Sequence, residues 1–322
     1  MARRMKDVLG SGLGQLRTHP LEAHVRAHLG DEIIVSTDHA LLVWEPWRIV
    51  PTYAVPRGDV FGDLVPEALP TDAATNATTN ATTDATTNAT TNRDGAAGSG
   101  AAGGAGAPGA SGGPEGSRAS VRSLDPRTPF GTHTSPGRSH TVHTAGQGGV
   151  EGAAFAFDDP DLDGYVALDF AAFTAWMEED DEVLGHPQDP FHRVACRRTS
   201  KHVVVTRDGE VLADTRRAVL LLETNIPGRY YIPRADVRQA ALEPSSTRSL
   251  CPYKGEATYW TAQVGERVVP DLARSYEQPL TEAAPIAGHL CFWHERTDLS
   301  IDGEQVARPR TRWSEDPDSA TQ

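Results

Sequence analysis

Short apolar runs separated by turn signals dominate this chain, and long helical periodicity is absent. In the second half, residues 202–206 end at Asp208-Gly209, which is typical of a hairpin turn, and residues 210–214 continue the pattern. Residues 218–222 are apolar throughout, which predicts a strand buried on both faces. The pattern predicts a mainly β protein.

Further segments of both halves also have the lengths and boundaries of strands. Residues 236–242 are instead expected to form one or two helical turns that Pro244 ends. The other predicted strands of the second half are residues 229–233, 255–264, 289–293 and 298–301, and those of the first half are 32–35, 40–44 and 49–55.

The two halves share a sequence pattern. Residues 40–45 and 218–223 are each an apolar run that ends in a glutamate, and residues 53–56 and 230–233 each begin with tyrosine and end with proline. The two glutamates are 178 positions apart (223 minus 45) and the two prolines 177 apart (233 minus 56). Such a self-match indicates an internal duplication.

A low-complexity segment interrupts the first half. Residues 71–120 consist of Thr/Asn tetrads and a Gly/Ala/Ser run without any aromatic residue, so they cannot bury enough apolar surface to offset chain entropy. We therefore predict a disordered insert in a surface loop. The expected organisation is an extension (1–20), a first, degenerate β domain (21–190), a second β domain that carries the motifs (191–306) and a polar tail (307–322).

Charge and composition exclude several protein classes. The formal charge is −14, with 30 basic against 44 acidic residues, which argues against coating of nucleic acid or membranes. The N-terminus lacks the apolar stretch of a signal peptide, and no run approaches the ~20 apolar residues of a membrane span. Cys196, Cys251 and Cys291 have the spacing of neither a disulfide scaffold nor a zinc site. We expect a reduced, cytoplasmic protein without a metal site.

The densest polar cluster is the segment 250–256, which contains Cys251, Tyr253, Lys254 and Glu256. In an extended segment, Lys254 and Glu256 would share one face. A desolvated lysine can act as a base or bind phosphate, and a glutamate beside it can hold a metal or a proton. The structural alternative is a surface ion pair beside a packed tyrosine and a buried cysteine.

A second cluster surrounds Glu223, which ends an apolar run and is followed by Tyr231 and Arg234. A glutamate in that position is costly unless it is paired, and Arg234 or Lys254 are natural partners. A purely structural ion pair is the alternative. In the first half, residues 128–133 stand at the place of the 251–256 segment and lack its cysteine, lysine and glutamate, so we assign the site to the second half.

The second half carries a series of short motifs: Glu223-Thr224, Arg229 to Arg234, Asp236-Val237, Cys251 to Glu256, Tyr259-Trp260, Ser275-Tyr276, Ile286 to Gly288 and Asp302-Gly303. With these motifs, residues 192–306 resemble the domain-of-unknown-function 427 family, which is sometimes labelled nucleotidyltransferase-like. The resemblance implies a compact β fold similar to the tent-like arrangement of the Mss4 type, without its zinc cysteines. Residues 21–190 look like the degenerate partner found in tandem members.

Two functions remain open at this stage. The first is a polar pocket in the second half that binds, and in an enzyme would act on, a small anionic, nucleotide-like ligand. The second is a non-enzymatic adaptor that binds a protein partner, and the sequence names neither a cofactor nor a partner. A deep polar pocket around Lys254 would favour the first, and a flat apolar patch the second. The candidate catalytic residues are Lys254, Glu256 and Glu223, and the candidate ligand contacts are Arg234, Tyr231, Cys251 and Tyr253.

Deletion of residues 71–120 is expected to leave the melting temperature nearly unchanged, because the segment has few large apolar side chains to pack. Differential scanning calorimetry of the deleted and full-length chains measures this. A drop of more than a few degrees would show that the segment packs against the rest of the protein.

Overall fold

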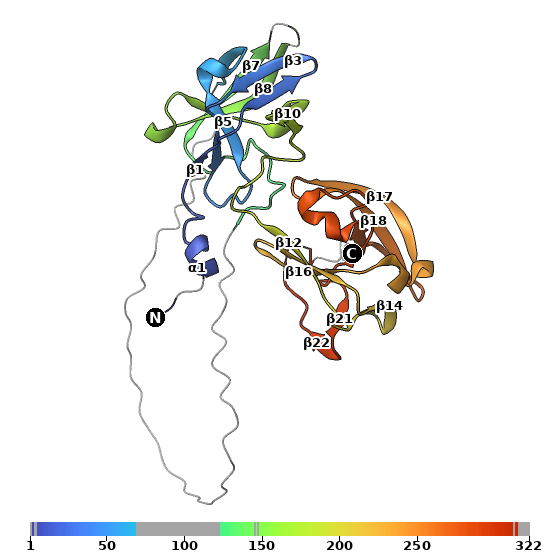
Figure 1. Ribbon diagram of the computed structural model, residues 1–322. Coiled ribbons are helices and arrows are strands. Elements are labelled where there is room, and N and C mark those ends of the chain that lie inside the picture. The colour runs from blue at the N-terminus through green and yellow to red at the C-terminus, as the bar shows by residue number, and fades with distance from the viewer. Residues whose placement is uncertain are drawn as a thin grey trace, which may run out of the picture. The chain divides into compact units, whose positions relative to one another are not determined.

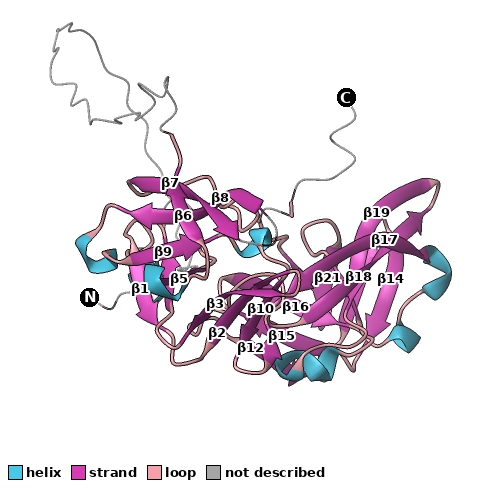
Figure 2. Ribbon diagram, turned by 90° about the horizontal axis from the view of Figure 1, so that it is seen from above, coloured by secondary structure: helices cyan, strands magenta, loops and turns pink. Residues whose placement is uncertain are grey.

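The computed structural model describes residues 2, 5–68, 123–144, 146, 148–311, 313 and 314. In this part of the chain, 22 strands form five sheets, as the mainly β prediction requires (Figure 1). Figure 2 shows that helices are short and peripheral to the strands. They are α1 (Met5–Gly10) and the 3-10 turns η1 (Arg57–Asp59), η2 (Pro160–Leu162), η3 (Phe170–Ala172), η4 (Arg234–Asp236), η5 (Gln239–Ala241) and η6 (Thr281–Ile286).

The first half contains a seven-stranded sheet of order β1-β4-β5-β9-β8-β7-β6 and a four-stranded sheet of order β11-β10-β2-β3. Every printed pairing in them is antiparallel. The strands are β1 (Arg17–Pro20), β2 (Val25–Leu29), β3 (Glu32–Thr37), β4 (Leu41–Trp44), β5 (Thr52–Pro56), β6 (Asp63–Pro66), β7 (Gly137–Thr144), β8 (Gly148–Phe157), β9 (Tyr165–Leu168), β10 (Ala175–Glu178) and β11 (Asp181–Glu182).

The second half contains three sheets, of orders β12-β15-β16, β14-β13-β21-β22 and β17-β18-β19-β20. An antiparallel bridge between Ile232 and Leu290 links the first of these sheets to the last. The strands are β12 (Val194–Arg198), β13 (Val203–Arg207), β14 (Glu210–Thr215), β15 (Val219–Glu223), β16 (Ile226–Tyr231), β17 (Leu242–Cys251), β18 (Gly255–Val264), β19 (Arg267–Ser275), β20 (Leu290–Phe292), β21 (Asp298–Ile301) and β22 (Glu304–Val306).

The strand order of the first half is repeated in the second. The series β1-β4-β5, β11-β10-β2-β3 and β9-β8-β7-β6 corresponds, strand for strand, to β12-β15-β16, β22-β21-β13-β14 and β20-β19-β18-β17. Pro56 is the N-cap of η1, which follows β5, and Pro233 is the N-cap of η4, which follows the corresponding strand β16.

A threonine–aspartate hydrogen bond is repeated in the two halves as well. The hydroxyl of Thr37 donates to Asp59 at 2.6 Å, and that of Thr215 donates to Asp236 at the same distance. Each pair ties the end of a β-hairpin to the 3-10 turn that follows. Descent of both halves from one duplicated domain remains our inference from these parallels.

The predicted insert, residues 71–120, lies entirely outside the described residues. The strands before and after it in the chain are β6 and β7, which pair with each other, Asp63 with His143. The segment therefore connects two neighbouring antiparallel strands of the first half, where the second half has the short turn between β17 and β18.

Two details of the predicted strands are wrong. Residues 218–222 are not buried on both faces, because Leu222 is 42% exposed while Leu221 is fully buried. Pro244 does not end a helical segment either, since it lies within the ten-residue strand β17, where a register shift accommodates it.

Replacement of Thr37 or Thr215 by valine should lower the free energy of unfolding by about 1.5–3 kcal/mol, because each buried hydroxyl donates to a carboxylate. The effect should be larger at Thr37, since Asp236 keeps a hydrogen bond from Arg217. Urea denaturation measures both changes. Serine at the same positions is the matched control and should retain most of the stability; equal losses for serine and valine would contradict the proposed role of the hydroxyl.

Candidate functional site

A buried ion pair joins Glu223 at the end of β15 to Lys254 in the turn between β17 and β18. The Lys254 ammonium lies 2.5 Å from Oε1 of Glu223, and the two side chains are 3% and 4% exposed. The turn is closed by Gly255, whose φ of 91° lies in the region that favours glycine. This tight turn directs the lysine into the protein.

His192 is the third member of this cluster, and its ring stacks on Tyr253 with centroids 4.1 Å apart. Its Nε2 lies 3.1 Å from Oε1 of Glu223. Burial alone would raise the pKa of Glu223, but the hydrogen bond from His192 and the charge of Lys254 lower it to about 2. Because the ionised carboxylate only accepts hydrogen bonds, we assign the proton of neutral His192 to Nε2, which leaves Nδ1 as an acceptor.

A hollow opens beside His192, and its wall includes Tyr253, Asp189 and Glu282. Two hydrogen bonds join the segment before His192 to the turn between β17 and β18. The backbone N–H of Asp189 donates to the Tyr253 hydroxyl at 2.6 Å, and the Gln188 side-chain amide donates to the carbonyl of Pro252 at 2.8 Å. Burial raises the pKa of Asp189. Glu178 also lines the hollow, and three carboxyl groups in this wall disfavour an anion at this position.

A row of polar side chains crosses the neighbouring sheet. The strand register pairs Arg274 of β19 with Tyr259 of β18 and with Cys291 of β20. The Arg274 residue is only 8% exposed, and its guanidinium carbon lies 4.4 Å from the ring centroid of Trp293. Burial raises the pKa of the Cys291 thiol, and the charge of Arg274 and its hydrogen bond oppose that shift. In the described part of the chain, no carboxylate lies within 4.0 Å of the Arg274 guanidinium.

Three buried polar atoms near this row have no hydrogen-bond partner within the described residues. They are Nε of Arg274, the hydroxyl of Tyr231 and Oε2 of Glu223. Tyr231 is fully buried, its pKa is raised by burial, and Arg274 opposes the shift. Unpaired buried polar groups are rare in proteins and each calls for a physical explanation.

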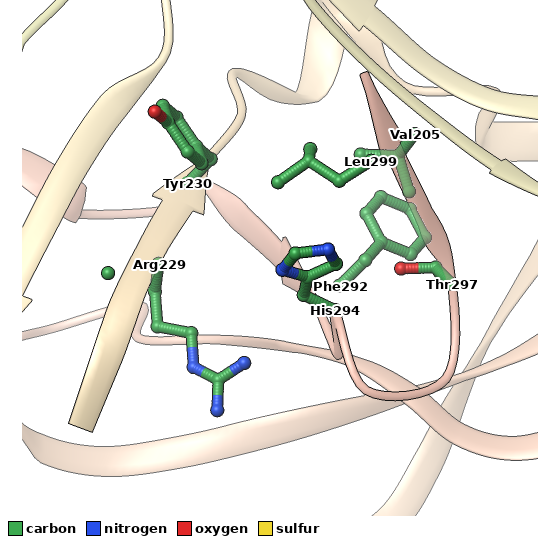
Figure 3. Close-up of a pocket in the computed structure, with 8 residues that line it drawn as sticks. Val205, Arg229, Tyr230, Phe292, His294, Thr297 and Leu299 are labelled. Carbon is green, nitrogen blue, oxygen red and sulfur yellow. The ribbon is translucent and has the colours of Figure 1, made fainter. Parts of the chain in front are cut away.

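A second buried ion pair neutralises the neighbouring arginine. Arg229 donates to both carboxylate oxygens of Glu295, at 2.6 and 2.7 Å. Beside it is a cavity of about 10 Å³, near the lower limit for one water molecule. Figure 3 shows His294 and Phe292 in its wall, with the Arg229 guanidinium directed away from Leu299. This cavity is too small to be the ligand site.

The structure brings together only some of the residues that the sequence singled out. Glu223 and Lys254 form the ion pair, Tyr253 joins them through His192, and Tyr231 and Cys251 lie in the adjacent core cluster. The remaining two, Arg234 and Glu256, lie elsewhere.

Arg234 hydrogen bonds to Glu277 and lies 4.7 Å from the ring centroid of Trp260. Glu256 is 60% exposed and lies 3.7 Å from Arg248. The expectation that Lys254 and Glu256 share one face is wrong, because the turn between β17 and β18 interrupts the extended segment after Cys251.

His192 and Arg274 are not among the residues that the sequence pattern singled out. His192 could have been suspected from its position just before β12, which pairs with β15 and so lies beside Glu223. Arg274 has no comparable local signal, because its importance depends on the distances to carboxylates from other strands.

The glutamate of the first half keeps a protonatable partner. Glu45 accepts from Nδ1 of His133 at 3.0 Å and from the backbone N–H groups of Thr134 and Ser135 at 2.6 and 3.1 Å. Burial raises the pKa of Glu45, but the hydrogen bonds from His133 and Thr134 lower it overall. This segment of the first half contains no lysine but supplies other donors to the glutamate.

The described residues contain neither a candidate metal site nor a candidate membrane-spanning helix. No group of three or more His, Cys, Asp and Glu side chains there could hold a metal ion. None of the described helices is long and apolar enough to cross a membrane.

The stability of the second half should depend on pH through Glu223. Its pKa of about 2 in the folded chain lies below its ordinary value of 4.5, so the stabilisation is present above 4.5 and is lost as the pH falls toward 2. The wild type should lose about 2–4 kcal/mol more than Glu223→Gln over this range. Denaturant unfolding at several pH values measures the difference, and parallel pH profiles would contradict this role.

Residues 195–303 match the family model described as Domain of unknown function (DUF427), labelled NTP_transf_9. The match contains Glu223, Lys254 and Arg274, whereas His192 precedes it. No curated protein matches the chain. The second half of this chain thus contains a DUF427 domain.

Proposed function

We propose that the second half binds a small anionic, nucleotide-like ligand, and that the anionic group is held by Arg274. One observation supports this most strongly. Among the buried cations of this half, Lys254 is paired with Glu223 and Arg229 with Glu295, whereas Arg274 has no carboxylate within 4.0 Å in the described chain.

The energetic argument concerns the cost of that charge. A guanidinium remains protonated when it is buried, so Arg274 cannot avoid the cost by losing its proton. Removing an ion from water costs several kcal/mol unless an opposite charge and hydrogen bonds compensate. Stacking on Trp293 offsets part of this, and a bound anion would supply the rest.

The neighbouring groups favour an acceptor-rich ligand. The Tyr231 hydroxyl is a buried donor without a described partner, and Nε of Arg274 is another. Phosphate and carboxylate groups accept several hydrogen bonds at once and match the planar fork of arginine. Lys254 and Arg234, which we first expected to face the anion, are already engaged by Glu223 and Glu277.

His192 supports an acid–base step in the same half. Glu223 holds its Nε2–H, so Nδ1 can accept a proton, and the ring forms part of the hollow beside Tyr253. A carboxylate that orients a histidine in one tautomer is a common arrangement for proton transfer. Glu223 is then a positioning residue, and Lys254 keeps it ionised.

Replacement of Arg274 by methionine should weaken the binding of inorganic phosphate and of AMP at least tenfold. Methionine removes the unpaired charge and fills similar space, so the variant should remain folded. Isothermal titration calorimetry measures the affinities, and circular dichroism verifies folding. Arg274→Lys, which keeps the charge, provides a second variant and should retain part of the affinity.

Arg234→Met is the matched control, because it removes a cation that Glu277 already pairs, and it should bind both probes as the wild type does. Equal loss of binding in the Arg234 and Arg274 variants would contradict the assignment to Arg274. Failure of the wild-type chain to bind either probe would reject the anion-binding function and favour the adaptor alternative.

A further inference from the structure

The C-terminal segment covers an aromatic and charged site of the DUF427 domain. The ring of Trp313 stacks on Trp293 with centroids 5.2 Å apart and an interplanar angle of 26°. The guanidinium carbon of Arg229 lies 5.4 Å from the ring centroid of Trp293 and 5.5 Å from that of Trp313. Trp313 therefore rests against both a tryptophan and an arginine.

A polar contact accompanies this stacking. The hydroxyl of Thr311 donates to Oε1 of Glu295 at 2.5 Å, while Glu295 also holds Arg229. The receiving residues Arg229, Trp293 and Glu295 are nearly completely buried beneath this segment. The contact thus combines ring stacking, a cation beside the ring and a carboxylate that accepts a hydrogen bond.

The covering segment lies outside the domain that it covers. The family match ends at residue 303, and all three receiving residues lie within the match, whereas Thr311 and Trp313 follow it. A DUF427 domain that ended with the match would present Trp293 and Arg229 without this cover. The occupant is therefore an addition to the domain rather than part of its core.

We propose that Arg229, Trp293 and Glu295 form a binding site for a planar aromatic ring, and that Trp313 occupies this site from within the same chain. The ligand class is a neutral or anionic ring such as a nucleobase or an indole. Each has a π-face for Trp293 and the Arg229 guanidinium, and each carries an N–H donor for Glu295. A cationic ring fits less well beside Arg229.

This site differs from the Arg274 anion site in the ligand chemistry that it recognises. Trp293 contacts both arginines, but a neutral ring makes no ion pair with Arg274. Neutral probes therefore test the aromatic site without testing anion binding. Phosphate binding by the same variants then shows whether the Arg274 site is intact.

The test uses the full-length chain with Trp313→Ala, and adenosine and N-acetyl-tryptophanamide as separate neutral probes. Removing the indole should lower the melting temperature and vacate the site. Millimolar probe should then restore part of the lost melting temperature, and saturation-transfer NMR should detect binding at least tenfold tighter than to the wild type. The probe that binds more tightly distinguishes a nucleobase from an indole.

Trp47→Ala is the matched control, because it removes a tryptophan that is 41% exposed and leaves Trp313 in place; it should bind neither probe. Trp313→Ala combined with Trp293→Ala should also abolish the rescue. Trp313→Leu, which keeps an apolar side chain, serves if the alanine variant does not fold. A folded Trp313 variant that binds neither probe, or that binds them no better than the wild type, would overturn the proposal.

Discussion

A carboxylate at the buried end of a strand is the constraint on which the chemistry of this protein depends. Glu223 ends β15 with its side chain 4% exposed, so leaving it unpaired would cost several kcal/mol. The turn between β17 and β18 directs Lys254 toward Glu223, and the lysine pairs with Oε1 of the carboxylate. His192 lies within hydrogen-bond distance of the same oxygen. The low pKa of Glu223 and the orientation of His192 follow from that arrangement.

The first half meets the same constraint with different groups. Glu45 stands at the corresponding strand end, and it is satisfied by His133 and two backbone N–H groups from residues that directly precede β7. Nε of Arg48 lies 3.8 Å from Oε1 of Glu45, so a positive charge also stands near this carboxylate. The first half thus stabilises its glutamate without a lysine from a tight turn.

Arg274 is a buried charge without a carboxylate within 4.0 Å among the described residues, and the proposed function depends on it. Each buried glutamate near it already has a cation, and the nearby hydroxyl of Tyr231 makes no hydrogen bond within the described residues. Buried charges that a protein does not pair internally are more common at binding sites than in purely structural cores. The hollow beside His192 has the opposite character because Asp189 and Glu282 line it, so the two regions would favour different parts of a ligand.

The sequence by itself determined the strand-rich fold, the repeated pattern that ends in Glu45 and Glu223, and the need of Glu223 for a cationic partner, because apolar periodicity, turn residues and the cost of an unpaired glutamate are local signals. Only the tertiary structure decided that Glu256 faces solvent, that Arg234 pairs with Glu277, and that His192 and Arg274 belong to the candidate site. The physical reason is that strand register and turn geometry set the distances between charges from different strands. A one-residue change in either reverses the face on which a side chain lies.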